Sequence, residues 1–229
     1  MLNMMRLDIF GMKSFWGRIC LRALLPFILI LAGAPVFFIA WMAYMMQDSA
    51  FYTFVTEEKG KLNHLYMTLP VNRKIIVRAR FALVLAFLAI GIMLGTVFML
   101  ALSALLYGRT IIFEYNFNPG FNKMLLLISS AVLYCGIVNL PTLPLLLKLG
   151  YNKGKFIGFY LPSFAMIAIV VLVALLMNNV EAFNESVLSF VAWAHSNVAL
   201  VSAMIMGAAV MTFAAAYALS QRVYAKREF

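Results

Sequence analysis

Long apolar runs with Lys and Arg gathered at their ends are the feature that most constrains this chain. A helix needs about 20 mostly apolar residues to cross about 30 Å of hydrocarbon. Runs of this kind fill most of the sequence, and only 11% of its residues are charged, whereas a soluble domain has about a quarter charged residues. We therefore predict an all-α polytopic membrane protein, with a single transmembrane domain over residues 1–229.

Six membrane spans fit the apolar runs. They are expected at residues 18–33, 35–55, 81–107, 124–147, 156–177 and 198–219. The first two could also form one long span, because Gly33-Ala34-Pro35 is the only break near their middle. With two spans, however, Arg109 and Lys123 are the only exceptions among 18 Lys and Arg residues that otherwise share one side. The positive-inside rule then predicts that both ends of the chain are cytoplasmic.

Local sequence patterns predict the structure of the segments outside the spans. Residues 1–17 have an apolar residue at each helical turn, which predicts an amphipathic helix in the membrane surface. The apolar positions are Leu2, Met5, Ile9, Met12 and Trp16. The connections between later spans are expected to be a loop at 108–122, a short basic loop at 148–155 and a polar loop at 178–197.

One long polar stretch, residues 56–80, interrupts the apolar sequence. Leu62, Leu65 and Tyr66 recur at spacings of three and four within a predicted helix over residues 57–67, and charged residues surround them. Pro70 disfavours helix at the residue before it, and Asn72 is a favourable N-cap for the next helix. An apolar anchor inside a polar rim is typical of a docking surface, so we expect this stretch to meet a partner in water.

The same stretch carries a family pattern. An acidic pair and a Lys precede Leu65-Tyr66, then Leu69-Pro70-Val71-Asn72-Arg73-Lys74, and finally Val77 and Arg80. This pattern resembles the permeases of the type-two export class of ABC transporters, in the branch that includes exporters of phenol-soluble-modulin and antimicrobial peptides. The resemblance implies that residues 56–72 form a cytoplasmic coupling segment that contacts a separate ATPase subunit. The residues it assigns to that contact are Glu57, Glu58, Lys59, Lys61, Leu62, His64, Leu65 and Tyr66.

The resemblance also implies partners. A second permease chain, identical or related, would complete the pathway, and each permease would hold one ATPase subunit, which binds ATP and Mg²⁺. This chain itself would hold no cofactor. The substrate would be hydrophobic or amphipathic, such as a peptide, and would be moved out of a bacterial cell across the plasma membrane.

Polar residues inside the expected spans are the candidates for a translocation pathway or a subunit interface. Asp48 lies beside Gln47 and Ser49 in the second span, where an ionisable group must face protein or water. Asp48 could line the pathway, or it could be a hydrated group near the interface, paired with an Arg such as Arg80.

The fourth and third spans add further positions of this kind. Asn139, Pro141 and Pro144 lie in the fourth span, where the prolines could form a gating kink or be ordinary features of a span. Gly91 and Gly95 of the third span form a small-residue pair that we assign to packing within the chain.

Missing motifs exclude several functions. The sequence has no P-loop, because Gly150–Lys155 has the wrong spacing, and it has no G-x-S-x-G or H-E-x-x-H motif. We therefore predict no catalytic, metal or cofactor site. The basic residues flank apolar runs, which indicates membrane topology and anionic lipid rather than nucleic acid. The alternatives to a transport subunit are a non-transporting immunity or regulatory membrane protein and, less favoured, an intramembrane enzyme.

Overall fold

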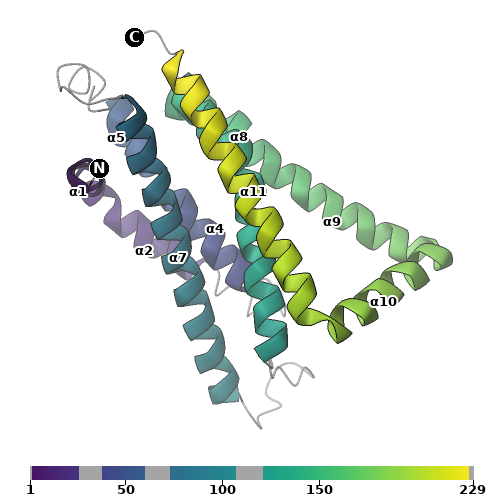
Figure 1. The fold of residues 1–229 in the computed structure, drawn as a ribbon. Coiled ribbons are helices and arrows are strands. Elements are labelled where there is room, and N and C mark those ends of the chain that lie inside the picture. The colour runs from purple at the N-terminus through teal and green to yellow at the C-terminus, as the bar shows by residue number, and fades with distance from the viewer. Residues whose placement is uncertain (1, 26–37, 60–72, 107–120, 227–229) are drawn as a thin grey trace.

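The computed structural model describes residues 2–25, 38–59, 73–106 and 121–226, and all the elements in these ranges are helical (Figure 1). The all-α class predicted from the sequence is therefore confirmed. In chain order the elements are α1 (Leu2–Gly11), the 3₁₀ turn η1 (Met12–Phe15), α2 (Trp16–Leu24), α4 (Phe38–Ala50), α5 (Tyr52–Lys59), α7 (Arg73–Leu106), α8 (Phe121–Lys155), the π-helical turn η3 (Phe156–Tyr160), α9 (Leu161–Asn179), α10 (Glu181–Ser196) and α11 (Val198–Ala225).

Three helices of the described ranges are long and apolar enough to cross a membrane, over Lys74–Ala101, Met124–Gly154 and Val198–Ala225. They correspond to the spans predicted at 81–107, 124–147 and 198–219. A fourth crossing results only if Val171–Asn179 and Glu181–Ser196, which are bent by 116° at their junction, are counted as one span. The count of six is thus not reached in the described part of the chain.

The first two predicted spans, 18–33 and 35–55, are only partly visible. α2 ends at Leu24, and residues 26–37 lie outside the described ranges. The 13 described residues of α4 are too few to cross a bilayer alone. The helix stops at Phe51, whose N–H bonds the Asp48 carbonyl three residues back, and α5 continues from Tyr52.

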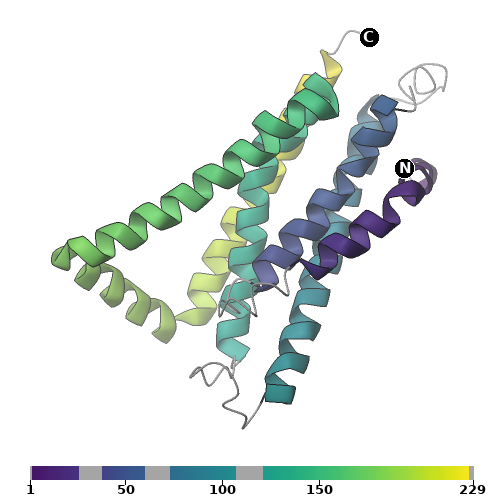
Figure 2. The same cartoon turned by 180° about the vertical axis from the view of Figure 1, so that it is seen from behind.

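The long helices form one bundle. α8 and α11 lie side by side along their lengths, and α4 packs against α7 and α8 (Figures 1 and 2). α9 leaves the bundle at the end where α8 finishes, and α10 returns to the start of α11, so that the two form an open V (Figure 2). The start of α7 and the ends of α8 and α11 lie at one end of the bundle.

The prediction of a polar loop at 178–197 is wrong, because α10 occupies Glu181–Ser196. The sequence of α10 contains no Gly or Pro to stop a helix, and Glu181 in its first turn interacts favourably with the helix dipole. Only Val180 is extended, with φ −127° and ψ 100°, and it makes the bend between α9 and α10.

The predicted basic loop at 148–155 is a tight reversal within helical structure. Gly150 has φ 78°, a conformation that favours glycine, and the chain is helical on both sides of it. After the turn the chain packs back on α8. A Cβ at Gly154 or Gly158 would lie 3.0 Å from Leu146 Cα or Thr142 Cα, so both positions need a small residue.

Gly91 and Gly95 lie in the contact between α7 and α4. A Cβ on Gly91 would be 2.8 Å from Ala43 Cα, and one on Gly95 would be 3.2 Å from Ile39 Cα. The two glycines therefore let the backbones of these helices approach closely. The assignment of this pair to packing within the chain is confirmed.

The N-terminal segment differs from the single amphipathic helix predicted for residues 1–17. It is interrupted by η1, and α2 begins at Trp16. Met12 and Phe15 are buried, whereas Ile9 and Trp16 of the predicted apolar face are exposed. α1 packs against α5 and α7. Gly11 lies close to α5, since a Cβ added at Gly11 would be 3.6 Å from Thr56 Oγ1.

Candidate functional site

Polar contacts from Glu57 and Glu58 join the end of α5 to two other elements. Residues 60–72, which follow α5 in the chain, lie outside the described ranges, and α7 begins at Arg73. Glu57 contacts α7, and Glu58 contacts the turn after Gly150 in α8. We call the contacts of Glu57 with Arg80 and of Glu58 with Asn152 the α5 anchor.

The Glu57–Arg80 ion pair is the buried half of the α5 anchor. Arg80 Nη2 lies 2.6 Å from Glu57 Oε2, and the two side chains are 1% and 5% exposed. The Arg80 guanidinium also stands 4.5 Å from the centroid of the Phe54 ring, within the range of a cation–π interaction. Because α5 precedes residues 60–72 and α7 follows them, this pair holds the two ends of that segment together.

The Glu58–Asn152 contact is the exposed half. Glu58 Oε1 accepts a hydrogen bond from the Asn152 side-chain amide at 3.0 Å, and Oε2 accepts one from the Asn152 backbone N–H at 3.2 Å. The reversal at Gly150 brings Asn152 to this position, and Glu58 lies 3.9 Å from where a Gly150 Cβ would be. The α5 anchor thus joins α5, α7 and α8 at one end of the bundle.

This geometry changes the role predicted for one residue of the docking surface. Glu57 was expected as a charge on an exposed rim, but it is buried and paired inside the chain, so it cannot act as a rim charge. Glu58 is exposed, and Lys59 is the last residue of α5. The remaining candidates for the ATPase contact lie outside the described ranges; they are Lys61, Leu62, His64, Leu65 and Tyr66.

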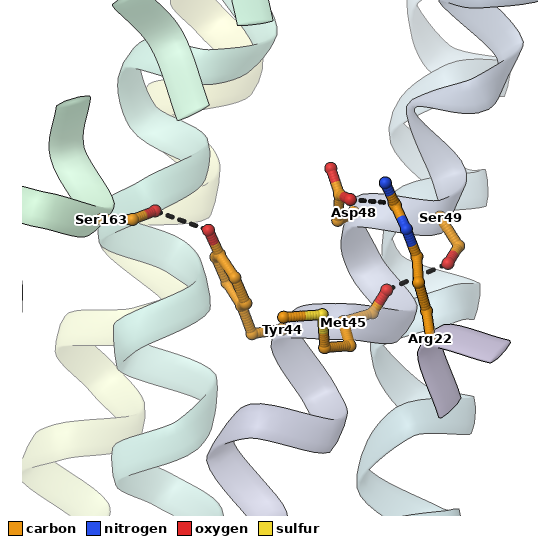
Figure 3. Close-up of polar contacts among 6 residues, drawn as sticks. All are labelled: Arg22, Tyr44, Met45, Asp48, Ser49 and Ser163. Carbon is orange, nitrogen blue, oxygen red and sulfur yellow. Dashed lines mark hydrogen bonds and ion pairs between the residues drawn. The ribbon is translucent and has the colours of Figure 1, made fainter. Parts of the chain in front are cut away.

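Asp48 faces protein, and its partner is Arg22 of α2 (Figure 3). Asp48 is 6% exposed, and Arg22 also stands 4.8 Å from the centroid of the Tyr52 ring. The expected pairing of Asp48 with an Arg is therefore confirmed, but that Arg is Arg22 rather than Arg80. An ion in an apolar bundle needs a counter-ion, but Arg80 is engaged by Glu57, so α2 supplies the counter-ion for Asp48.

A second polar contact extends from α4 in a different direction. The hydroxyls of Tyr44 and Ser163 are 2.6 Å apart, which ties α4 to the start of α9 (Figure 3). The Tyr44 ring also lies 5.5 Å from that of Tyr134 on α8, measured between centroids. Ser49 donates its hydroxyl to the Met45 carbonyl of its own helix, so this candidate makes a bond within α4.

Gln47 and Asn139 are the two buried carboxamides of the candidate pathway. Both are fully buried, on α4 and α8, which pack against each other. Among the described residues, neither side chain has a hydrogen-bond partner for its nitrogen or its oxygen. A buried polar group without a partner costs about 1–3 kcal/mol. The free energy of this packed arrangement would therefore fall if water or a polar ligand reached the two amides.

Pro141 and Pro144 do not break α8. The only residue of α8 with non-helical backbone angles is Gly150. The Thr142 hydroxyl, between the two prolines, lies 2.5 Å from the Val138 carbonyl and also contacts the Gly158 carbonyl. Whether the prolines act as a gate stays a prediction.

The pairings of the α5 anchor could not be read from the sequence. Glu58 and Asn152 are 94 positions apart, so no helical spacing relates them. The available signal was that charges in an apolar bundle must pair, which predicts a partner without naming it. In the parts of the chain that the structure describes, no group of His, Cys, Asp and Glu could hold a metal ion.

Residues 3–225 match the model of a family described as ABC-2 family transporter protein. No curated protein and no solved structure matches the chain.

Proposed function

The chain belongs to the ABC-2 family of transporter proteins, and from this premise we propose that it is the permease subunit of an ATP-driven exporter. The proposed cargo is a hydrophobic or amphipathic substrate, such as a peptide. A second permease chain, identical or related, completes the pathway, and a separate ATPase subunit binds ATP and Mg²⁺.

The α5 anchor is the observation that carries this proposal. A segment that receives force from an ATPase can move the bundle only if its ends are held firmly to the helices that must move. The Glu57–Arg80 pair holds both ends of residues 60–72, and Glu58 ties the same place to α8. Movement of that segment therefore reaches α4, α7 and α8 together, because α5 follows α4 directly and packs on α8.

The proposed pathway residues are the buried polar groups of α4 and α8. Gln47 and Asn139 have no partner in the described ranges, so a state in which α4 and α8 separate would hydrate them. Asp48 contributes through α2, because its pairing with Arg22 sets where α2 lies against α4. Substrate would enter from the bilayer or its inner surface.

The proposed orientation places both termini in the cytoplasm of a bacterial cell. Lys74, Arg78 and Arg222 lie near the start of α7 and the end of α11, at the same end of the bundle. Basic residues favour the cytoplasmic side, which supports this orientation. It places the α5 anchor on the side where ATP is available.

The rival proposal is an immunity or regulatory membrane protein that transports nothing. The two differ in whether an ATPase binds at residues 60–72. The test is to purify the chain from its native membrane and to measure co-purified ATPase and ATP hydrolysis. Leu65→Asp combined with Tyr66→Ala should leave membrane insertion intact and remove the ATPase, because buried anchors at interfaces each contribute about 2 kcal/mol or more.

A matched control separates loss of docking from general damage. Phe121→Asp introduces a negative charge, as Leu65→Asp does, but at the start of α8, far along the helix from Asn152. Phe121 is 81% exposed, so this variant should leave ATPase binding unchanged. Retention of the ATPase and of its activity by the Leu65→Asp, Tyr66→Ala variant would exclude the proposed docking site. Absence of any ATPase from the purified wild-type protein would favour the rival.

A further inference from the structure

Gln47 lies on the inner side of α4, in a bundle whose helices contact one another in the ring α4, α7, α11 and α8 (Figure 1). Tyr44, one turn before it, contacts α8. Met46 contacts α7, since a Cβ added at Gly91 would be 2.9 Å from Met46 Cβ. In an α-helix, position 47 falls between positions 44 and 46 around the axis. Gln47 therefore lies between the side of α4 that faces α8 and the side that faces α7.

Asn139 occupies a comparable place on α8. It follows Gly136 by one turn, and a Cβ added at Gly136 would lie 3.3 Å from the Phe213 ring of α11. Residues one turn apart share a face of a helix, and Asn139 is fully buried. Asn139 is therefore enclosed by the bundle on the side of α8 that turns toward α11.

The two carboxamides lie at nearly the same depth. Tyr44 meets Tyr134, and the α5 anchor joins the same two stretches of chain farther along, so α4 and α8 run in the same direction. Gln47 and Asn139 come three and five residues beyond these tyrosines. At about 1.5 Å per residue, they differ in depth by about 3 Å. One ligand in the interior of the bundle is thus able to meet both.

The chemistry of the pair indicates what such a ligand must offer. In the described part of the chain, Gln47 and Asn139 have no hydrogen-bond partner for the nitrogen or the oxygen of either side chain. Each carboxamide has two N–H donors and one acceptor oxygen and carries no charge. The neighbouring Asp48 is turned toward Arg22 of α2 (Figure 3). A neutral ligand with both a donor and an acceptor suits this pair best.

We propose that Gln47 and Asn139 bind the backbone amide groups of a peptide cargo when α4 and α8 separate. This inference rests on the proposed function, because it takes the interior of the bundle as the pathway. A peptide bond offers one N–H donor and one C=O acceptor, which are the groups that a carboxamide complements, whereas an acyl chain offers neither. Each carboxamide donates to a backbone carbonyl and accepts from a backbone N–H.

Two consequences follow for the cargo. All peptides share the same backbone, so the pair holds cargo with little regard to its side chains. The cargo also satisfies amides that lack partners in the packed arrangement, so it binds the separated arrangement of α4 and α8 better. A ligand with such a preference shifts the population toward the state that it binds.

The test compares peptide and ester ligands on the purified full chain in detergent. Isothermal titration calorimetry gives the Kd of acetyl-Leu-Ala-Leu-Ala-amide and of its depsipeptide, in which ester oxygens replace the backbone N–H groups between residues. The depsipeptide should bind at least about tenfold more weakly, because a site that hydrogen-bonds an N–H rejects an analogue without it. Acetyl-Val-Phe-Val-Phe-amide, with the same backbone and other side chains, should have a Kd of the same order as the first peptide.

A variant pair locates the contact. Gln47→Met with Asn139→Leu keeps the approximate shape of both side chains and removes their hydrogen-bonding groups. The unfolding temperature should rise, because polar groups buried without partners are removed, so weaker binding does not result from unfolding. The Kd for the peptide should rise at least about tenfold, and the variant should no longer distinguish peptide from depsipeptide. Loss of this discrimination is the signature of a direct contact.

Ser202→Ala is the matched control. Ser202 is also buried, and its hydroxyl has no hydrogen-bond partner in the described ranges. It precedes Phe213 on α11 by eleven residues, which places it about 16 Å along the helix from the level of Gly136. This variant should keep both the affinity for the peptide and the preference for peptide over depsipeptide.

The remaining outcomes overturn the inference. It falls if the wild-type chain binds neither peptide, or if it binds peptide and depsipeptide equally. It also falls if the Gln47→Met, Asn139→Leu variant still prefers the peptide, or if Ser202→Ala loses that preference as well.

Co-purified ATPase, measured on the same preparations, tests the proposed function separately. An active ATPase on a chain that does not distinguish peptide from depsipeptide removes the backbone site and leaves the exporter. Selective peptide binding by a chain that carries no ATPase removes the exporter and leaves the backbone site.

Discussion

The carboxylate of Glu57 lies 2.6 Å from the guanidinium of Arg80, and this buried pair joins the helix before residues 60–72 to the helix after them. An ion pair at such a place contributes more than stability. It makes the two ends of the segment move as one unit, which is what the proposed coupling to an ATPase requires.

Variants of the Glu57–Arg80 pair can distinguish a role in the stability of the fold from a role in coupling to the ATPase. Arg80→Met should destabilise the fold by about 3–5 kcal/mol, because it leaves the Glu57 carboxylate buried without a counter-ion. Glu57→Leu with Arg80→Met should restore most of the stability, since apolar pairs often replace buried ion pairs at little cost. The double variant should nevertheless lose substrate-stimulated ATP hydrolysis. Thermal unfolding and ATPase assays on the complex measure the two effects; full activity of the stable double variant would show that the pair has only a structural role.

Glu58 and Asn152 provide a milder test of the same anchor. Asn152→Ala should change the free energy of unfolding by less than about 1 kcal/mol, because the contact is exposed. It should still lower the ATPase stimulation by substrate, since the polar contact that ties the end of α5 to α8 is then lost. The control is Asn179→Ala, which removes an exposed side-chain amide that bonds only its own helix. Equal activity in the two variants would argue against a role for Asn152 in coupling.

Asp48 is predicted to position α2 rather than to stabilise the fold. Asp48→Leu should express normally, because the Arg22 side chain is 21% exposed and can turn toward the membrane surface. It should change transport or substrate-stimulated ATPase activity, because the ion pair between α2 and α4 is then lost. Arg22→Gln should have the same effect, and the two changes together should add little. Unchanged transport with a more stable protein would remove Asp48 from the proposed pathway.

Gly91 and Gly207 make a matched pair of glycine positions. Gly91→Ala should destabilise the fold by about 1–3 kcal/mol, because its Cβ would come within 3 Å of α4 and force α4 and α7 apart. Gly207→Ala should be neutral or stabilising, since nothing lies within 4 Å of its Cβ and alanine favours helix. Thermal unfolding of both variants checks the prediction. Equal stabilities would mean that α4 does not pack on α7 at Gly91.

The orientation can be tested by labelling single cysteines in a variant without Cys20 and Cys135. An impermeant reagent added outside the cell should label Ser186→Cys, on α10, and should not label Asn152→Cys or Gly17→Cys. All three positions are exposed in the structure, so a missing label does not result from burial inside the protein. Labelling at Asn152 from outside would reverse the proposed topology.

The sequence alone determined the class of this protein and the place of its long helices. The spans over 81–107, 124–147 and 198–219 could be predicted because hydropathy acts along a continuous stretch of chain. The packing role of Gly91 and Gly95 could also be predicted, because their spacing places both on one face of a helix. These features depend on residues that are neighbours in the sequence.

Tertiary structure decided the pairing of charges and the path of the chain outside the long helices. Arg80 was a reasonable partner for Asp48, yet it pairs with Glu57, and Asp48 pairs with Arg22. Burial requires each charge to find a partner, but which partner is nearest depends on how α2, α5 and α7 pack. The loop predicted at 178–197 is a helix for a related reason: its many polar residues suggested a loop, although they do not prevent helical hydrogen bonds. The local sequence pattern thus specifies which segments are buried in the membrane or in the protein. Which side chains pair depends on how segments far apart in the chain pack together.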